Sequence, residues 1–297
     1  MDDKIVVTGG AGFIGSNIVK GLNRRGYTNL IVVDNLGNNS GKFSNLVDCE
    51  IADFIDKQAF LPMVNSGYLG EGVRAVFHQG ACSDTMELDG QYMMANNYDY
   101  SKSLLEACQQ AALPFIYASS ASVYGGGKVF AERRTNEAPL NVYGYSKFLF
   151  DQYVRRHRSR FTTQVVGFRY FNVYGPGEQH KGRMASVSFH FFNQFNAQGY
   201  VNLFKGSDGY GDGCQLRDFI YVDDVVAANL HCLDQPQIRG IFNLGTGQAS
   251  TFNDVALAVV NYCRGKTGTG PLTLESAVEQ ELEPSIDFPQ GLRARDQ

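Results

Sequence analysis

The chain has 297 residues, enough for one large domain or for two that share a core. Apolar residues make up 43% of it and charged residues 19%, which is a globular rather than a disordered composition. With 26 Lys and Arg against 30 Asp and Glu, the formal net charge is -4, and no block of like charges suggests nucleic-acid binding. No apolar run approaches the roughly 20 residues that span a bilayer, and the N-terminus lacks a signal-peptide pattern. We therefore expect a cytoplasmic protein without a membrane partner.

The cysteine and histidine spacings predict no metal site. The six cysteines are scattered without a C-x-x-C pair, so we expect reduced thiols, mostly in the core. The five histidines form neither an H-x-x-x-H pattern nor a mixed Cys/His ligand spacing. A structural or catalytic zinc ion is therefore not expected.

Short apolar runs alternate with longer segments of helical periodicity through the first two thirds of the chain. The runs predict strands at 5–8, 30–34, 75–78, 114–119 and 164–168. The segments between them predict helices that include 13–25, 97–112 and 145–157. Strands that are apolar throughout and separated by helices indicate a parallel sheet covered on both faces. With right-handed crossovers, this pattern predicts a doubly wound, Rossmann-type α/β fold.

The regular alternation of apolar runs and helical segments ends after about residue 172. Glycine-rich loops at 175–177 and 206–213 precede a predicted strand at 241–244 and a helix at 252–262, with Ser250 or Thr251 as its N-cap. Residues from about 265 are expected to be irregular. We therefore expect a first domain of 1–171 plus about 217–243, and a smaller C-terminal α/β lobe of 172–216 plus about 244–297.

The first strand leads into a glycine-rich turn, TGGAGFIG, that opens a helix. Gly9 permits a tight turn, Gly12 lets the backbone approach a pyrophosphate, and Gly15 allows close packing of helix on strand. The backbone N–H groups and the positive end of the helix then face phosphates. Asp34 ends the second strand 19 residues after Gly15, where an acid binds the adenine ribose. These features together predict a dinucleotide site in the first domain.

The sequence by itself leaves the choice between NAD and NADP open. Asp34 favours NAD, because a carboxylate repels a 2′-phosphate. Lys42 and Lys57 are close enough in sequence to offset that charge, although both are equally compatible with solvated surface positions.

Two Y-x-x-x-K patterns occur, Tyr98 with Lys102 and Tyr143 with Lys147. This spacing puts both side chains on one helix face, where the ammonium lowers the tyrosine pKa and prepares a general base. The second pattern follows the strand at 114–119, whose carboxyl end carries Ser119, Ser120 and Ser122. Ligands bind outside the carboxyl ends of such strands, so we predict that Tyr143 is catalytic and that Tyr98 packs its helix.

Five segments together resemble the extended short-chain dehydrogenase/reductase family over nearly the whole chain: TGGAGFIG, SSASVYG, YGYSK, FRYFNVYGP and RDFIYVDD. Within the family, the segments 79–83, 92–94, 141–150 and 180–186 look like the epimerases of an ADP-linked heptose. The resemblance implies inversion at C6 through transient NADP-dependent oxidation to a 6-ketone. It also implies a homo-oligomer, typically a pentamer, that supplies heptose for lipopolysaccharide core in the bacterial cytosol.

The resemblance assigns roles to residues one by one. It implies that Tyr143 and Lys181 are an acid/base pair, supported by Ser120 and Lys147. The implied cofactor positions, besides the three glycines, are Phe13, Ile14, Asp34, Asn35, Lys42, Lys57, Gln79, Gly80, Ala81, Cys82, Ser83, Asn96, Lys147, Val173 and Lys181. The implied substrate positions are Ser120, Asn172, Arg183, His190, Phe204, Lys205, Gly206, Ser207 and Arg217.

Three alternatives remain. A UDP-hexose 4-epimerase shares the chemistry but gives Lys181 no role, and a dehydratase needs a carboxylate that Ser120-Ala121-Ser122 does not supply. A dinucleotide-binding protein with impaired catalysis is the third, because the family continues for about one helix-sized segment beyond Gln297. Asp296 also stands where the family usually has a substrate-contacting tyrosine.

Overall fold

The structure is a computed structural model that describes residues 3–37, 41–69, 72–280 and 282–286. Asp296 lies outside these residues. The larger part is a seven-stranded parallel sheet in the order β10-β6-β5-β4-β1-β2-β3. Its strands are β1 (Lys4–Thr8), β2 (Leu30–Asp34), β3 (Asp53–Asp56), β4 (Val73–His78), β5 (Phe115–Ser120), β6 (Val165–Tyr170) and β10 (Gly240–Leu244). All six predicted strands are present, with ends shifted by at most two residues.

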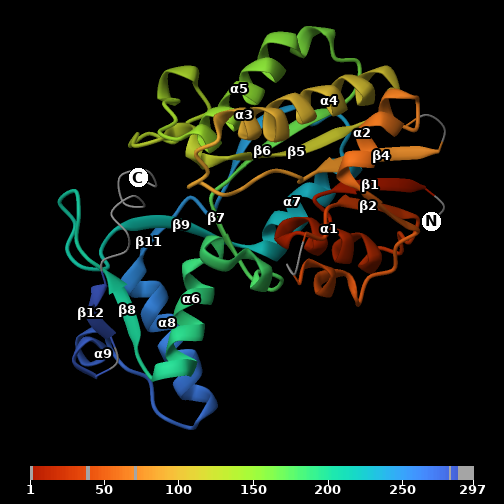
Figure 1. Cartoon of the computed structure of the whole chain (residues 1–297). Coiled ribbons are helices and arrows are strands. Elements are labelled where there is room, and N and C mark those ends of the chain that lie inside the picture. Colours follow the sequence, from red (N-terminus) through yellow and green to blue (C-terminus); the bar gives the residue numbers. More distant parts are fainter. Residues whose placement is uncertain (1–2, 38–40, 70–71, 281, 287–297) are drawn as a thin grey trace.

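Helices cover both faces of this sheet (Figure 1). One face carries α1 (Phe13–Arg24) and α7 (Val222–Asp234), and the other carries α2 (Lys57–Asn65), α4 (Tyr100–Gln110) and α5 (Val142–His157). Alternate residues of β1 serve the two faces, since Ile5 and Val7 pack toward α1 and Val6 packs toward α4. Gly21 lets α1 and α7 approach closely, because a Cβ there would lie 2.5 Å from Val226 Cγ1. The doubly wound Rossmann-type fold is confirmed.

The helix predicted at 97–112 begins earlier than expected. The helical run starts with α3 (Gly90–Met93), passes through a π-helical turn at Met94–Asp99 and continues as α4. The π turn widens the helix by one residue, and it contains Asn96 and Asn97. The two asparagines are therefore carried at the edge of the sheet, as described below.

The remaining elements form a smaller part of the molecule. A three-stranded sheet, in the order β11-β9-β7, contains β7 (Asn172–Tyr174), β9 (Leu216–Tyr221) and β11 (Ala249–Thr251). Beyond it lie α6 (Val187–Gln198), β8 (Val201–Phe204), α8 (Phe252–Lys266), α9 (Leu274–Gln280) and β12 (Leu282–Ile286), with a core that includes Phe191, Leu203 and Val260 (Figure 1). Thr251 caps α8 in a capping box with Asp254, as one of the two predicted caps.

The prediction of irregular structure from about residue 265 was wrong. Helix α9 and strand β12 follow α8, and β12 pairs with β8 in parallel. The Gly, Thr, Glu and Pro content of this segment concealed both elements, because tertiary pairing outweighs weak local preference. Among the described residues, no helix is long and apolar enough to cross a membrane.

Candidate active site

The glycine-rich turn after β1 lies at the point where the strand order reverses, between β1 and β4. Gly9 has φ +67, and its N–H donates to Val33 O at 2.7 Å. A Cβ at Gly9 would lie 2.6 Å from Gly80 N, and one at Gly15 would lie 2.1 Å from Gly9 O. Packing within the protein therefore requires glycine at both positions. A Cβ at Gly12 would meet, among the described atoms, Gly9 O at 3.1 Å, so this glycine leaves room for another group to approach.

This turn fits a dinucleotide. Gly12 is the N-cap of α1 and has no side chain that could cap the helix, so the first N–H groups, beginning at Phe13 and Ile14, are available to an anion. Gln79, which follows β4, donates its N–H to Thr8 O at 2.9 Å. Its side-chain Nε2 is buried and has no hydrogen-bond partner among the described residues. An open glycine edge, a helix N-terminus and an unpaired buried donor are together suited to binding phosphates.

Asp34 lies at the carboxyl end of β2 and is almost fully buried. Its Oδ2 accepts from Ala11 N at 3.0 Å, and its Oδ1 accepts from Asn35 N at 2.7 Å and from Lys42 Nζ at 2.8 Å. Lys42 also donates to Asn35 O at 3.2 Å. The carboxylate at the expected ribose position is thus paired with a cation, which removes much of its repulsion for a further phosphate.

Lys57 has a different partner. It opens α2 after β3 and donates from Nζ to Asn96 Oδ1 in the π turn. The next residue of the π turn, Asn97, forms two hydrogen bonds with the backbone of Cys82: its Oδ1 accepts from Cys82 N at 2.8 Å, and its Nδ2 donates to Cys82 O at 2.9 Å. The π turn therefore holds the segment Gln79–Ser83, which includes Gly80 and Ala81, beside the glycine-rich turn.

Ser120, Tyr143 and Lys147 come together at the carboxyl end of β5. Ser120 ends the strand, caps a 3₁₀ turn at Ala121–Tyr124 and accepts a hydrogen bond from Ser122 Oγ at 2.9 Å. Tyr143 lies in the first turn of α5, and its side chain is close enough to that of Ser120 to interact with it. The expectation that Lys147 lowers the pKa of Tyr143 was wrong: burial raises that pKa, and the interaction with Ser120 lowers it only in part. A substrate hydroxyl at this position would contact both oxygens.

Lys147 is one turn further along α5. Its Nζ donates to Ala118 O at 2.8 Å, and the side chain is 5% exposed. Burial lowers the pKa of Lys147 to about 8, although the carboxylate of Asp151 acts in the opposite direction. The ammonium is therefore charged at neutral pH, with little margin.

The other Y-x-x-x-K pair packs a helix, as predicted. Lys102 Nζ lies 5.0 Å from the centroid of the Tyr98 ring and 5.8 Å from that of Tyr153. These cation–π contacts tie α4 to α5 on the outer side of the helical layer.

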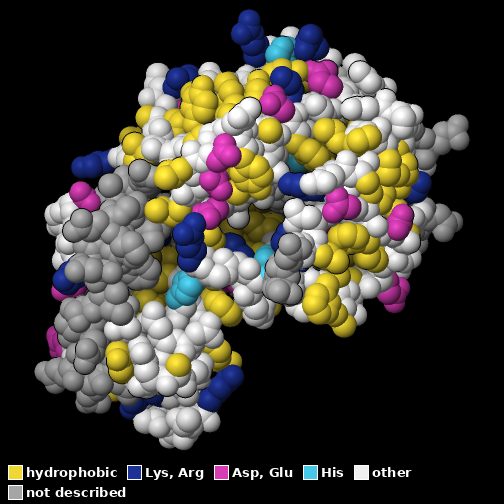
Figure 2. All heavy atoms as spheres, viewed as in Figure 1, with side chains coloured by type: hydrophobic (Ala, Val, Ile, Leu, Met, Phe, Trp, Pro, Cys, Tyr) yellow, Lys and Arg dark blue, Asp and Glu magenta, His cyan; other side chains and the backbone are white. Residues whose placement is uncertain are grey.

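Lys181 lies in the 3₁₀ segment Gln179–Met184, with Nζ 5.2 Å from the centroid of the Phe13 ring. Burial lowers the pKa of Lys181, and Glu178 opposes this shift. The described contacts of Lys181 are with Phe13 and Glu178, whereas Tyr143 contacts Ser120. The structure therefore does not bring the two expected acid/base groups into direct contact. Figure 2 shows a hollow on this face of the molecule, with basic and histidine side chains around it.

The expected substrate residues lie in two groups. Around the glycine-rich loop after β8, the ring centroid of Phe204 lies 4.6 Å from that of Phe252, with the two rings tilted, and the Arg217 guanidinium lies 5.7 Å from the centroid of the Phe252 ring. Three hydrogen bonds to its backbone fold that loop: Lys205 O accepts from Gln215 Nε2 at 2.7 Å, Gly206 N donates to Asp212 Oδ1 at 2.6 Å, and Ser207 O accepts from Tyr210 N at 2.9 Å. Phe204 and Arg217 therefore share one aromatic neighbour, Phe252.

The second group lies closer to the seven-stranded sheet. Asn172 donates from Nδ2 to Asp218 O at 3.2 Å, and Val173 follows it on β7. Arg183 forms an ion pair with Asp84 at 2.6 Å, which links the segment 179–184 to the loop after β4. His190 lies on α6 next to Phe189.

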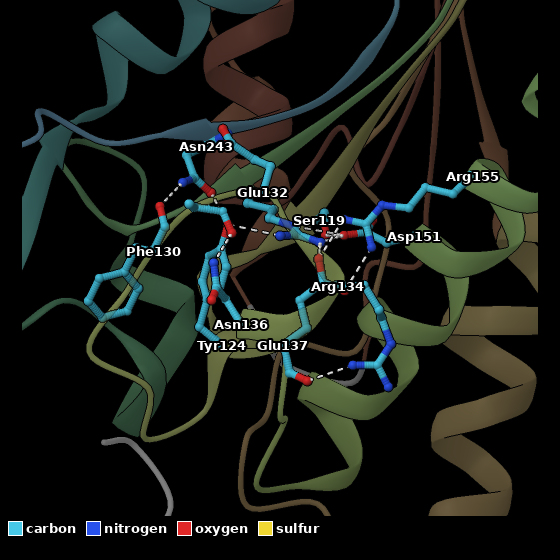
Figure 3. A network of polar contacts seen from close by, with 12 residues as sticks. Ser119, Tyr124, Phe130, Glu132, Arg134, Asn136, Glu137, Asp151, Arg155 and Asn243 are labelled. Carbon is cyan, nitrogen blue, oxygen red and sulfur yellow. Dashed lines mark hydrogen bonds and ion pairs between the residues drawn. The ribbon is translucent and has the colours of Figure 1, made fainter.

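One buried polar network was missed by sequence reasoning. Arg169 in β6 is fully buried and contacts Asp151, Glu137 and Tyr124, and the network continues to Asn243 (Figure 3). Two signals were present in the sequence: an arginine within an apolar strand, and an aspartate four residues after Lys147. Within the parts of the chain that the structure describes, no cluster of His, Cys, Asp and Glu could hold a metal ion.

The fold is that of a Rossmann-type α/β protein, and the site combines a turn suited to a dinucleotide with a serine, a tyrosine and a lysine at the carboxyl end of one strand. The chain belongs to the NAD dependent epimerase/dehydratase family, whose model matches residues 5–245.

Individual relatives give a narrower comparison. The chain is 60% identical to the ADP-L-glycero-D-manno-heptose-6-epimerase of Thiobacillus denitrificans over 99% of this chain and 89% of that protein. The crystal structure of the Helicobacter pylori ADP-L-glycero-D-manno-heptose-6-epimerase matches with a TM-score of 0.77 and 31% identity, over 96% of this chain and 88% of that one. The Thermus thermophilus UDP-glucose 4-epimerase in complex with NAD matches with a TM-score of 0.70 and 29% identity, over 96% and 87%.

Proposed function

We propose that the protein is an epimerase that converts ADP-D-glycero-D-manno-heptose to ADP-L-glycero-D-manno-heptose by inverting C6. The observation that carries this proposal is the meeting of Ser120, Tyr143 and Lys147 at the carboxyl end of β5, next to a turn suited to a dinucleotide. The choice of sugar is supported by the 60% identity to a heptose epimerase. We further propose that residues 1–171 with 217–243 bind the cofactor, and that 172–216 with 244–297 bind the substrate.

The proposed cofactor is NADP. Gly9, Gly12 and Gly15 would hold its pyrophosphate, and the ion pair between Lys42 and Asp34 would accept the additional phosphate of its ribose. NAD is the alternative, as bound by the Thermus thermophilus enzyme. When bound, the cofactor supplies a reversible hydride acceptor, which is needed because C6 of a heptose carries no acidic proton.

The side chains supply the proton transfers. Tyr143, held by Ser120, takes the proton of the C6 hydroxyl as the sugar is oxidised to a 6-ketone. Inversion requires the ketone to turn its opposite face to the cofactor, so its oxygen moves to a new position. Lys181 would be the acid/base group there, and each such group contributes about 10²–10⁴ in rate. Burial lowers the pKa of Lys181, which is the direction that favours release of its proton.

The remaining predicted residues would bind the nucleotide sugar. Arg217 carries a guanidinium that suits the diphosphate, and Phe204 to Ser207 form the loop beside it. Asn172, Arg183 and His190 would contact the sugar side. We also propose that the enzyme acts as a homo-oligomer, a pentamer, in the bacterial cytosol, where it supplies heptose for lipopolysaccharide core.

The test is incubation of the cofactor-loaded protein with ADP-D-glycero-D-manno-heptose labelled with deuterium at C6, followed by NMR. We expect the inverted sugar with the deuterium retained. Loss of the label to water would reject the oxidation mechanism. Conversion of UDP-glucose in a parallel sample, with no inversion of the heptose, would favour the 4-epimerase.

A further inference from the structure

Arg169 is the fully buried centre of a cluster of charges beside the candidate catalytic residues. Its Nε donates to Asp151 Oδ2 at 2.9 Å, its Nη2 to Glu137 Oε1 at 2.5 Å and its Nη1 to Tyr124 OH at 2.8 Å. Arg155 completes the cluster with two bonds to Glu137, at 2.5 Å and 2.7 Å. Figure 3 shows Asp151 and Arg155 from α5, Tyr124 from the 3₁₀ turn after β5 and Glu137 from the loop before α5 converging on one another.

Each partner of Arg169 is close in sequence to a candidate catalytic residue. Asp151 follows Lys147 by one helical turn, and it also accepts hydrogen bonds from Tyr117 OH at 2.9 Å and Ser119 Oγ at 3.0 Å, on β5. Asp151 thus fixes α5 against the strand that ends in Ser120. Tyr124 closes the 3₁₀ turn that Ser120 caps, and Glu137 precedes α5.

Stability alone explains this cluster poorly. Arg169, Asp151 and Glu137 are all buried, and the desolvation of buried ion pairs commonly offsets their attraction. Apolar side chains of similar volume would fill such a site at least as well. The charges balance within the cluster, since two arginines face two carboxylates, whereas Lys147 adds a further cation one turn from Asp151. What the cluster provides is a fixed geometry with an anion next to Lys147.

We propose that Asp151 and Arg169 are positioning residues for the epimerisation: they hold Ser120, Tyr143 and Lys147 in register. This inference rests on the proposed function for its turnover measurements. A displacement of about 1 Å at a reacting group can lower a rate by about 10²-fold, so a small shift of α5 against β5 is sufficient.

The charged and titratable groups around Lys147 determine how its pKa changes when one of them is removed. Asp151 faces it from α5, Cys82 from the loop after β4 and His78 from the end of β4. Of these, Asp151 is the partner whose carboxylate raises the pKa of Lys147 against burial, which lowers it. Removal of that carboxylate therefore lowers the pKa of Lys147 below about 8.

The experiment compares Asp151→Asn and Arg169→Lys with Gln164→Met in the full-length, cofactor-loaded protein. Gln164 is the matched control because it is equally buried, immediately before β6 at the opposite end from Arg169, and donates to three backbone carbonyls. We expect Asp151→Asn to lower kcat about 10- to 100-fold, with KM and cofactor affinity changed less than about threefold. The alkaline limb of the pH–activity profile of Asp151→Asn should move to lower pH. Arg169→Lys should lower kcat less and keep the pH profile, because Asp151 keeps its charge.

Gln164→Met should lose stability while it keeps kcat and the pH profile. An unchanged kcat in folded Asp151→Asn would overturn the inference. So would a decrease of kcat in Gln164→Met as large as that in Asp151→Asn. If Asp151→Asn does not fold, Arg169→Lys decides, and wild-type kcat in that variant counts against the proposal. A direct readout is NMR titration of ¹³C-labelled Lys147, whose pKa should fall by at least about one unit in Asp151→Asn. That titration remains valid if the wild-type protein does not invert the heptose, so failure of the proposed function is recognised separately.

Discussion

The ammonium of Lys147 and the carbonyl oxygen of Ala118 are joined by a hydrogen bond of 2.8 Å. The bond links α5 to β5 two residues before Ser120, so the helix that carries Tyr143 is attached directly to the strand that ends in Ser120. A buried lysine in this position is sensitive to pH, because desolvation disfavours its charged form.

Activity should therefore fall on the alkaline side near pH 8. The pKa of Lys147 is lowered to about 8, so its ammonium is intact below that pH and is lost as pH rises through it. We expect kcat/KM to decrease above about pH 8 and Lys102→Met, in the other Y-x-x-x-K pair, to show the same profile as the wild type. A flat profile through pH 9 would contradict the role given to Lys147.

Tyr143→Phe should lower inversion by about 10²–10⁴-fold, because the substituted ring cannot exchange the hydroxyl proton. Cofactor binding, measured by titration with NADPH, should change little. Tyr98→Phe is the control, since Tyr98 packs against Lys102 and Tyr153 rather than at the end of β5. Similar losses of inversion activity in Tyr143→Phe and Tyr98→Phe would contradict the assignment of the catalytic role to the Tyr143 motif alone.

Lys181→Met should also lower inversion by about 10²–10⁴-fold if this side chain is the second acid/base group. Its contact with the ring of Phe13 offers another explanation, in which Lys181 only supports the start of α1. Measurement of NADPH affinity separates the two. Weaker cofactor binding with full turnover at saturating cofactor would reject the two-base mechanism.

Lys42→Glu should weaken NADP binding at least about tenfold more than NAD binding, because it replaces the cation paired with Asp34 by a second anion. Calorimetric titrations with both nucleotides test this. Lys20→Glu, which reverses the charge of a lysine paired with the exposed Asp48, is the control. Equal losses of affinity for NADP and NAD would return Lys42 to a general surface role.

His78 should make the protein less stable in mild acid. Burial lowers the pKa of His78 to about 3, and Lys147 adds to the shift. Below about pH 6.5 the unfolded chain binds a proton that the native state excludes, so stability falls as pH decreases toward 3. Urea unfolding should show a loss of about 2 kcal/mol between pH 7.5 and 5, and a smaller loss in His78→Gln. Equal losses in both proteins would contradict this assignment.

The parts of the fold that follow from simple patterns were predictable. Buried parallel strands such as Leu30–Asp34 are continuous apolar runs, and the glycine-rich turn has a fixed spacing. The π turn at Met94–Asp99 was not, because one additional residue in a helix hardly changes the period, and its stabilising bonds go to Cys82, which is distant in sequence. Strand β12 depends in the same way on pairing with β8.

The site was predictable where chemistry and spacing coincide, as for Tyr143 and Lys147 on one helix. The pairing of Lys42 with Asp34 depends on the path of an intervening loop, so the sequence allowed it without selecting it over Lys57. The partners of Arg169 come from three separate segments of the chain, and no local pattern relates them.

The path of the chain between its two sheets has a practical consequence. After β6 it leaves the seven-stranded sheet for β7, returns as α7 and β10, and leaves again for β11. A fragment that ends at residue 171 would therefore lack both the outer strand β10 and helix α7, which packs against Gly21 of α1. The complementary fragment would contain β10 and α7 without the sheet and the helix against which they pack. Truncation cannot isolate either half, so dissection of this enzyme calls for point substitutions or for co-expression of complementary segments.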